Sequence, residues 1–429
     1  MRWLRTELDR LLSSGWMYAV LWAISRAFLG YTWATKAQYI GGDVHYYLSQ
    51  VTNTTSWSSS LVEYPTPVAW AMHVLLAVTG GDPGAFVWAF ATSMLVLDAA
   101  MGVLVWRLSS RSWRSTATMT WILFVTLLGP LAYFRFDMAP AVLAGAGALL
   151  ARRRPALAGA LIAFGAALKL WPALLVLPLL GVDRKARRSA VGFGVTGGVL
   201  ALSSLLIGGW QRLLSPLSWQ SDRGLQVESL PASPLMWLRT AQDGGDWIVE
   251  LSRYNAYEIA GPGVPVALQI ATAATLVGFF VAILIGVRAA WLGRRTTRGV
   301  ATVMLAIILI MIVVNKTLSP QYILWLGGPL AALIGGSESK SPPTFGWPVA
   351  WAFVCFALAY ATQVVYPMRY GEIVFGTGKP LAVSILVLRN VALAVFTVVV
   401  SWKAWRITAQ PPRTPKHMSL EVEVPDSVA

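Results

Sequence analysis

Charged residues are scarce in this 429-residue chain: they make up 12% of it, whereas soluble domains carry about a quarter. Hydrophobic residues make up 56%, and the mean hydropathy is +0.60. Because a helix satisfies its own backbone hydrogen bonds in lipid, we predict an all-α polytopic membrane protein. The net charge of +15 would suggest nucleic acid in a soluble protein. Here the basic residues follow apolar runs and indicate inner-leaflet anchoring, so no nucleic-acid partner is expected.

Cysteine and histidine are almost absent from the sequence. Cys355, the one cysteine, lies within an apolar run, so an intramolecular disulfide is excluded. The three histidines are scattered along the chain at His45, His73 and His417. Together with a single cysteine they do not have the spacing of a zinc site. We therefore expect neither a bound metal nor a cofactor.

Nucleotide-binding motifs are missing as well. The sequence has no G-x-G-x-x-G between a predicted strand and helix, and no D-x-D pair for a metal-bound nucleotide sugar. Residues 376–380 resemble the end of a P-loop. However, Ile373 stands where that motif has its first glycine, and Pro380 stands where it has a hydroxyl residue. The pattern does not indicate a nucleotide donor.

About twelve apolar runs are candidates for crossing a bilayer, which takes about 20 helical residues. They lie at residues 16–34, 85–106, 117–134, 139–151, 156–169, 171–182, 191–207, 264–287, 300–314, 322–334, 347–366 and 381–402. Several in the middle are short, which is typical of tilted or broken helices. Residues 66–79, 210–219 and 230–238 are predicted to be helices at the membrane interface.

We predict a single transmembrane domain over residues 1–410 and a polar, Pro-rich, disordered tail over 411–429. Basic clusters fall on alternate connections, at residues 107–114, 152–154, 184–188 and 288–298. The positive-inside bias places these clusters, both termini and the tail in the cytoplasm. The first outer loop, 36–84, and the long loop, 208–263, then face outward from the plasma membrane, and we expect the chemistry there.

The first outer loop holds a carboxylate in a setting typical of an active site. Asp43 follows two glycines and precedes His45 and Tyr46, and Glu63 comes later in the same loop. We expect Asp43 to be a general base, and His45, Tyr46 and Glu63 to contact a sugar or an acceptor. An equally good interpretation is that Asp43 only caps a short helix over 44–51.

Several cations on the same predicted face are candidates for binding a phosphate. Arg135 stands near Asp137, so it either forms a local ion pair or meets a phosphate while that carboxylate orients it. Lys169, at a helix break, either extends to the surface or binds phosphate. Lys316 precedes a proline near a helix start, where anions are favoured. Arg223 in the long loop completes the set.

Other outer-loop side chains are candidates for binding the sugar or the acceptor: Gln226, Glu228, Gln321 and Tyr322. Trp57 and Trp219 have rings suited to stacking on a sugar, whereas most tryptophans belong to interfacial belts. Asp98 lies inside a predicted span, where an unpaired carboxylate is costly. We predict Arg26 as its structural partner.

A carboxylate, several cations and aromatic rings beside lipid suit the transfer of a sugar from a lipid-linked phosphate donor. Cations stabilise the leaving phosphate, and the carboxylate removes the proton of the acceptor hydroxyl. The expected partners are therefore a lipid-phosphate sugar, a hydroxyl-bearing acceptor and the bilayer. This chemistry needs neither a metal nor a nucleotide.

Several motifs occur in the order found in a known family. They are the aspartate before paired tyrosines, Glu63-Tyr64-Pro65, Arg135-Phe136-Asp137-Met138-Ala139-Pro140, Lys169-Leu170-Trp171-Pro172, Arg223-Gly224-Leu225-Gln226-Val227-Glu228-Ser229 and Ser319-Pro320-Gln321-Tyr322. From about residue 39 to 326 the chain thus resembles the GT-C glycosyltransferases of family 87, which include actinobacterial polyprenyl-phosphate-mannose-dependent mannosyltransferases.

The resemblance implies a GT-C fold, an inverting transfer, a polyprenyl-phosphate donor and a catalytic aspartate that maps onto Asp43. It makes a membrane hexosyltransferase acting on an envelope glycolipid or glycan the expected function, with mannose as the sugar. Some relatives use a decaprenyl-phosphate arabinofuranose donor, so that sugar stays an alternative. A transporter or flippase of lipid-linked sugar is a second alternative, and a non-catalytic subunit is a third. Transporters show repeated halves and midplane sites, whereas the polar residues here gather on one face.

Overall fold

A computed structural model of the chain describes residues 14–54, 56–57, 59–292, 296–337 and 346–409. The predicted disordered tail, 411–429, lies outside the described residues. In chain order the elements, with η marking short helical segments of other types, are α2 (Gly15–Lys36), η1 (Gln38–Gly41), α3 (Gly42–Thr52), α4 (Thr66–Thr79), α5 (Pro83–Leu108), α6 (Arg114–Leu128), η2 (Pro130–Tyr133), α7 (Met138–Leu150), α8 (Pro155–Leu168), η3 (Trp171–Leu179), α9 (Arg184–Ser221), α10 (Ser233–Ala241), β1 (Ile248–Leu251), β2 (Tyr257–Ala260), α11 (Val264–Leu292), α12 (Thr297–Val313), η4 (Pro320–Leu326), α13 (Gly327–Gly335), α14 (Trp347–Gln363), η5 (Val364–Met368), α15 (Tyr370–Val374) and α16 (Pro380–Ala409).

Long apolar helices dominate the structure. Among the described residues, five helices are long and apolar enough to cross a membrane: α5, α9, α11, α16 and the helical stretch Trp347–Met368, which α14 and η5 form together. Shorter apolar helices are α4, α7, α8 and α12. In the part of the chain that the structure describes, the protein is an all-α membrane protein apart from one small hairpin. That all twelve predicted runs cross the bilayer stays a prediction.

Single residues account for several helix starts and for one close helix contact. Asp82 caps α5 by accepting a hydrogen bond from the backbone of Ala85 at 2.6 Å, and Asp183 caps α9 in the same way. α8 and α9 pack almost backbone to backbone, because Gly192 has no side chain to meet the carbonyl of Ala156. Small residues permit this approach between membrane helices.

Glycine and proline interrupt several of the predicted spans. The run 117–134 is divided into α6 and η2, because Gly129 adopts φ +85° and a proline follows it. The run 171–182 is the 3-10 helix η3, which carries Pro178 in its interior. The run 322–334 is divided into η4 and α13. The middle of the chain therefore consists of broken helices.

The predicted partner of Asp98 is confirmed. Both carboxylate oxygens accept from Arg26, at 2.8 Å from Nε and 2.9 Å from Nη2. Trp22, Trp121 and Tyr133 also donate to this carboxylate, at 2.8–2.9 Å. The cluster ties α2, α5, α6 and η2 together within the bundle.

The long loop predicted at 208–263 has more structure than expected. Gly209, at φ +71°, kinks α9 and separates the predicted span 191–207 from the predicted interfacial helix 210–219. The predicted helix 230–238 is found as α10. Strands β1 and β2 form an antiparallel hairpin in which Glu250 faces Glu258. The all-α prediction missed this hairpin.

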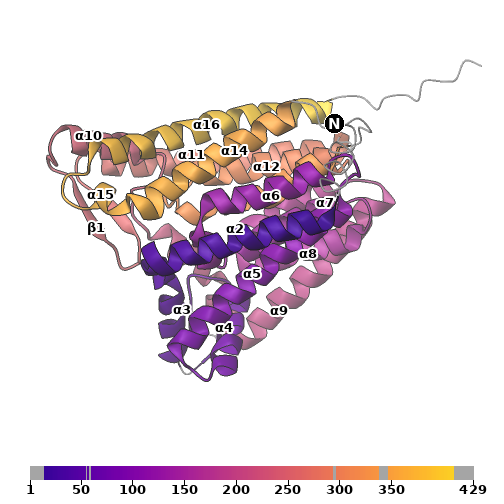
Figure 1. The fold of residues 1–429 in the computed structure, drawn as a ribbon, viewed down its shortest axis with the longest axis horizontal. Coiled ribbons are helices and arrows are strands. Elements are labelled where there is room, and N and C mark those ends of the chain that lie inside the picture. Colours follow the sequence, from indigo (N-terminus) through magenta and orange to yellow (C-terminus); the bar gives the residue numbers. More distant parts are fainter. Residues whose placement is uncertain (1–13, 55, 58, 293–295, 338–345, 410–429) are drawn as a thin grey trace, which may run out of the picture.

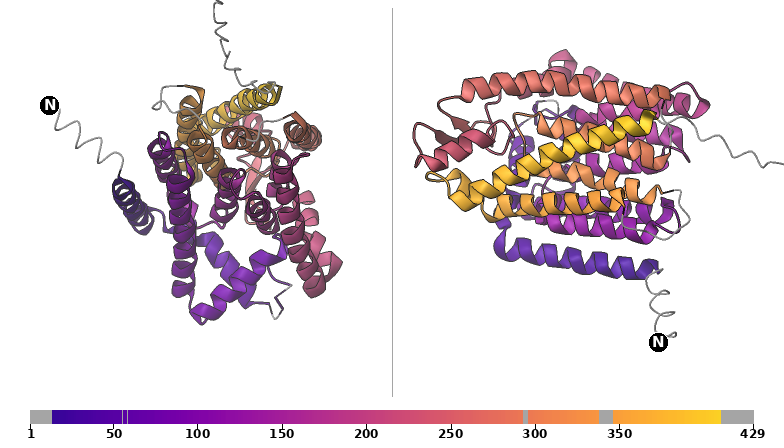
Figure 2. Two further views of the ribbon diagram at one scale, coloured as in Figure 1. Left: turned by 90° about the vertical axis from the view of Figure 1, so that its right-hand side faces the viewer. Right: turned by 90° about the horizontal axis from the view of Figure 1, so that it is seen from above.

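The arrangement in space brings three chain regions to one end of the bundle. α10, α15 and β1 lie together at that end (Figure 1). They share a small apolar core made of Leu225, Val227, Met236, Ile259, Ile373, Leu386 and neighbouring residues. α3 and α4 project from the bundle (Figures 1 and 2). α3 packs against α5, and α4 packs against α5 and α9. α16 crosses α12 and also contacts α11 and α14.

Candidate active site

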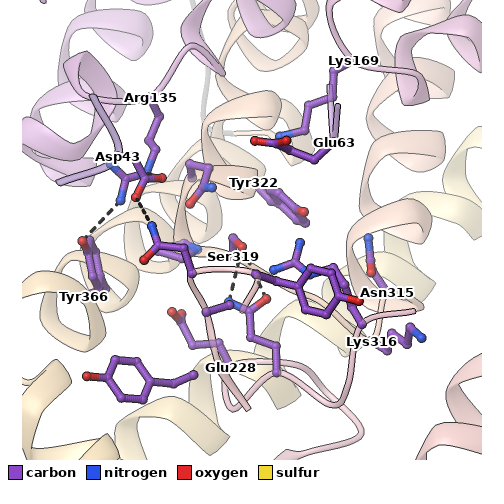
Figure 3. A pocket seen from close by; sticks show the side chains of 18 of the residues that line it. Asp43, Glu63, Arg135, Lys169, Glu228, Asn315, Lys316, Ser319, Tyr322 and Tyr366 are labelled. Carbon is purple, nitrogen blue, oxygen red and sulfur yellow. Dashed lines mark hydrogen bonds and ion pairs between the residues drawn. The ribbon is translucent and has the colours of Figure 1, made fainter. Parts of the chain in front are cut away.

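A cavity of about 1500 Å³ lies between these regions. Its walls come from α3, the segment 63–65, the turn before α7, η3, the end of α9, the segment 223–228, the hairpin tip, α11, η4 and the segment 366–375. Figure 3 shows acidic, basic and aromatic side chains from these elements facing a common space. Segments that are hundreds of residues apart in the chain thus form one site.

Asp43 lies in the first turn of α3 and borders this cavity. Its Oδ2 is 2.8 Å from Arg135 Nε, and its side chain keeps 24% of its exposure. Asn255 donates a long hydrogen bond of 3.5 Å to Oδ1. The capping interpretation is wrong, because α3 begins at Gly42 with Gly41 as its N-cap residue. The side chain turns to Arg135 and the cavity instead.

The surroundings of Asp43 tune its basicity. Burial raises the pKa of the carboxyl, and the positive charge of Arg135 opposes that rise. Asp137 raises the pKa further, whereas Lys169 and Arg223 lower it. Because the net direction is upward, the carboxylate binds a proton more readily than an ordinary aspartate does. A general base benefits from this direction of shift.

Arg135 is buried and its partners differ from the predicted one. It donates from Nη1 to the carbonyls of Ile40 and Phe134, at 2.9 and 2.8 Å, and from Nη2 to the hydroxyl of Tyr366 at 3.3 Å. The expected pairing with Asp137 is wrong. The Asp137 carboxylate, two residues along the chain, faces another wall. Asp43 is distant in sequence, but the packing of α3 brings its carboxylate against the Arg135 guanidinium.

Asp137 pairs with Lys169 instead. The Lys169 ammonium lies 2.7 Å from Oδ1 of Asp137, and Trp325 Nε1 donates to the same oxygen at 2.6 Å. The ammonium is also 4.8–5.2 Å from the ring centres of Phe136, Tyr322 and Trp325. Contacts of this kind stabilise a desolvated cation. Lys169 therefore points into the cavity wall and does not extend to the surface.

A second carboxylate, Glu63, lines the cavity. Tyr46 donates its hydroxyl to Glu63 Oε1 at 2.8 Å, and burial raises the pKa of Glu63. The loop that carries Glu63 is held from α9, where Arg212 donates to the carbonyls of Tyr64 and Leu61 at 2.9 and 3.2 Å. The end of α9 therefore fixes the position of this carboxylate.

Two further cations lie on the opposite wall. Arg223 and Lys316 both border the cavity, and their segments are joined by a hydrogen bond of 3.1 Å from Gln226 N to the carbonyl of Lys316. The Gln226 side chain meets the hydroxyl of Ser319 at 3.3 Å. The arrangement places cations facing the acidic wall that Asp43 and Glu63 form. Such a site can hold a phosphate on one side and deprotonate a hydroxyl on the other.

The family model of glycosyltransferase family 87 matches residues 63–320, which is more than half of the chain. The chain belongs to glycosyltransferase family 87. Glu63, Arg135, Lys169, Arg223 and Lys316 lie within the matched residues. Neither the comparison with curated proteins nor the comparison with solved structures gives a match.

Two residues predicted for the site of this glycosyltransferase, His45 and Trp57, do not line the cavity. His45 is exposed on α3 and is not among the described residues that line the cavity. Asp43 and Tyr46 are three residues apart and share a helix face, whereas His45 points to another side. Trp57 stacks on His73 with ring centres 5.3 Å apart, so the expected sugar stacking is not supported for this tryptophan.

The other predicted binding residues do reach the cavity: Gln226, Glu228, Gln321, Tyr322 and Trp219. Tyr322 stacks on Trp325 with ring centres 4.2 Å apart. Glu228 borders the cavity, but its carboxylate forms a fully buried ion pair of 2.8 Å with Arg389 of α16. That contact anchors the segment 223–229. The sequence did not predict the pairing of Glu228 with Arg389.

Sequence reasoning missed the hairpin tip, where Tyr254 and Asn255 border the cavity, and Tyr366, which contacts Arg135. A signal for the hairpin exists, since residues 248–251 and 257–260 contain β-branched and aromatic residues and flank a short polar segment. Within the described residues, no three His, Cys, Asp or Glu side chains gather in a way that would hold a metal.

Proposed function

We propose that this glycosyltransferase moves a sugar, expected to be mannose, from a polyprenyl-phosphate donor to a hydroxyl of an envelope glycolipid or glycan. One observation carries the proposal: a single cavity joins the Asp43–Arg135 pair, the cations of the opposite wall and an apolar wall. A site with these three parts can bind a charged, lipid-linked sugar and deprotonate its acceptor.

The apolar wall supports a lipid-linked donor. Leu276 and Phe279 of α11 line the cavity and are 69% and 39% exposed. Leu174 of η3 and Met311 of α12 continue the same wall. Because α11 is apolar enough to cross a membrane, this side of the cavity adjoins lipid. A polyprenyl chain would bury such a surface, whereas a water-soluble nucleotide sugar would leave it uncovered.

The reaction follows from the positions of the charges. Asp43 takes the proton of the acceptor hydroxyl while the hydroxyl oxygen forms a bond to the anomeric carbon of the donor. The bond from that carbon to the phosphate oxygen breaks, the electron pair stays on that oxygen, and polyprenyl phosphate leaves. Arg223 and Lys316 stabilise the charge on the leaving phosphate. A single displacement of this kind inverts the configuration of the sugar.

A transfer assay in detergent tests the proposal. Purified protein is supplied with polyprenyl-phosphate [¹⁴C]mannose or decaprenyl-phosphate [¹⁴C]arabinofuranose and with an envelope lipid extract. We expect label from the mannose donor to appear in the extract and polyprenyl phosphate to accumulate. Transfer from the arabinofuranose donor alone would reassign the sugar. If neither donor is consumed in detergent, where transport cannot occur, the result would contradict the proposal and favour a flippase.

The proposal includes a GT-C fold with about twelve crossings, both termini in the cytoplasm and the cavity facing outward from the plasma membrane. The basic clusters, which the positive-inside bias assigns to the cytoplasm, support this orientation. Arg223→Cys and Arg153→Cys, each in a Cys355→Ser background, test it in intact cells with an impermeant thiol reagent. We expect labelling at position 223 and protection at position 153, and the reverse pattern would overturn the orientation.

A further inference from the structure

The hairpin β1–β2 ends in a well-defined tip. Ser252 N donates to the carbonyl of Ala256 at 2.9 Å, and Asn255 N donates to the carbonyl of Ser252 at 3.1 Å. Asn255 adopts φ +53°. A three-residue hairpin loop that ends in a left-handed residue is a common way to connect two strands. The tip therefore presents the side chains of Tyr254 and Asn255 in fixed positions.

The base of the hairpin is anchored to the segment 223–229, which carries Arg223. Ile259 N donates to the carbonyl of Leu225 at 2.9 Å, and Val227 N donates to the carbonyl of Tyr257 at 3.1 Å. The Tyr257 ring packs edge-on against the Tyr370 ring, with centres 5.8 Å apart. The hairpin is thus fixed at its base to the wall opposite α3.

The tip extends from that wall to the acidic one. Asn255 Nδ2 lies 3.5 Å from Asp43 Oδ1, as Figure 3 shows by a dashed line at Asp43. The ring of Tyr254 meets Trp219 edge-on at 5.2 Å, and the Arg223 guanidinium lies 5.8 Å from the same ring. The tip therefore spans the cavity between α3 and the end of α9.

The two oxygens of Asp43 have different neighbours. Oδ2 faces Arg135, which is buried and held by backbone carbonyls. Oδ1 faces the Asn255 amide. A hydroxyl that approaches Oδ1 to give up its proton must come within contact distance of the hairpin tip.

We propose that Asn255 is a positioning residue that orients the Asp43 carboxylate from the side opposite Arg135, and that the tip 253–255 forms the acceptor side of the cavity. This inference rests on the proposed transfer reaction. The amide can donate to Asp43 while its carbonyl oxygen accepts from a second hydroxyl of the acceptor sugar. Tyr254 then offers a ring face or edge to that sugar.

Asn255 also has a simpler explanation, since asparagine tolerates positive φ better than most residues. Glycine tolerates that conformation at least as well and has no side-chain amide. Asn255→Gly therefore keeps the turn and removes the contact with Asp43. Asp243, an exposed residue at φ +51° in the turn after α10, supplies a matched control, Asp243→Gly.

The experiment compares wild type, Asn255→Gly, Asn255→Asp and Asp243→Gly in the detergent assay, with kcat and KM for each substrate across pH. We expect Asn255→Gly to lower kcat about tenfold, in line with one lost hydrogen bond to a charged group, with little change in the KM for the donor. Asp243→Gly should match wild type.

The pH profile separates positioning from a structural role. The charged groups around Asp43 are Arg135, Asp137, Lys169 and Arg223, and the phenols of Tyr46, Tyr47, Tyr64 and Tyr366 are close by. Removing a donor to the ionised carboxylate disfavours that form. The acidic limb of kcat/KM should therefore move to higher pH in Asn255→Gly, and further in Asn255→Asp, where a like charge faces Asp43.

Two outcomes would contradict different claims. If Asn255→Gly and Asn255→Asp keep the rate and the pH profile of wild type, Asn255 is only a turn residue and the inference is wrong. If wild type itself transfers no sugar, the proposed function fails, and the variants are not needed to show it. Thermal unfolding of each purified variant in detergent confirms that the compared proteins are folded.

Discussion

Two aspartate–arginine pairs in this protein have the same contact distance and different surroundings. The distance from Oδ2 to Nε is 2.8 Å both in Asp98–Arg26 and in Asp43–Arg135. Asp98 is fully buried inside the bundle and also accepts hydrogen bonds from two tryptophans and a tyrosine. Asp43 keeps 24% of its exposure and faces a cavity.

The difference shows what separates a structural carboxylate from a reactive one. Each carboxylate oxygen has two lone pairs, and the donors around Asp98 use nearly all of this capacity. A saturated, enclosed carboxylate has no room for a substrate proton. Asp43 receives one short contact and one long one, so an acceptor hydroxyl can still approach it. Replacing the aspartate by asparagine should therefore lower mainly the turnover rate at Asp43 and mainly the free energy of unfolding at Asp98.

The largest effect on rate is expected for Asp43→Asn. The amide keeps the shape of the side chain but cannot take a proton, so turnover should fall by about 10²–10⁴. The variant should stay folded and bind the donor. The detergent transfer assay measures the loss, with Asp82→Asn as a control, since asparagine also caps helices. Near-normal turnover would remove Asp43 from the mechanism and make Glu63 the next carboxylate to test.

The largest effect on stability is expected for Asp98→Asn. This change leaves the Arg26 charge buried and unpaired, which costs about 3–5 kcal/mol of the free energy of unfolding. Asp43→Asn should cost less, about 1–2 kcal/mol, because its site is open to the cavity. Thermal or denaturant unfolding in detergent measures both. If the free energy of unfolding fell equally in Asp98→Asn and Asp43→Asn, the two pairs would not differ in their contribution to stability.

A smaller effect is expected for Lys316→Ala. If Lys316 binds the donor phosphate, the loss of one charge-assisted contact should weaken donor use by about 1.5–3 kcal/mol, mostly as a higher KM. Lys379→Ala is the matched control, because its side chain is 71% exposed and pairs with Glu372. Unchanged donor kinetics in Lys316→Ala would assign this lysine a structural role only.

Much of the candidate site could be predicted from local pattern. Asp43, Glu63, Lys169 and Lys316 stand out because polar residues beside apolar runs are costly unless they are used or paired. The pairing of Asp98 with Arg26 follows from the same cost. The apolar runs also indicated the membrane class, and motif order indicated family 87, which the family model confirms.

The partners within the site could not be predicted in this way. Nearness in sequence favoured Asp137 as the partner of Arg135, but the turn before α7 directs these two side chains to different walls. Arg135 instead contacts Asp43, which lies far from it in the chain. Glu228 pairs with Arg389 of α16 for a similar reason. Contacts between residues so far apart in the chain depend on how the helices pack, and no single stretch of sequence encodes that packing.

The sequence by itself determined the membrane class, the family and most of the charged residues that border the cavity, because hydropathy and costly polar residues are local properties. Only the tertiary structure decided which of these residues touch. It placed the hairpin tip against Asp43 and Arg135 on the other side of that carboxylate. It also left His45 on the outside of α3. The physical reason is that side-chain direction and long-range packing, rather than composition, set the distances on which proton transfer depends.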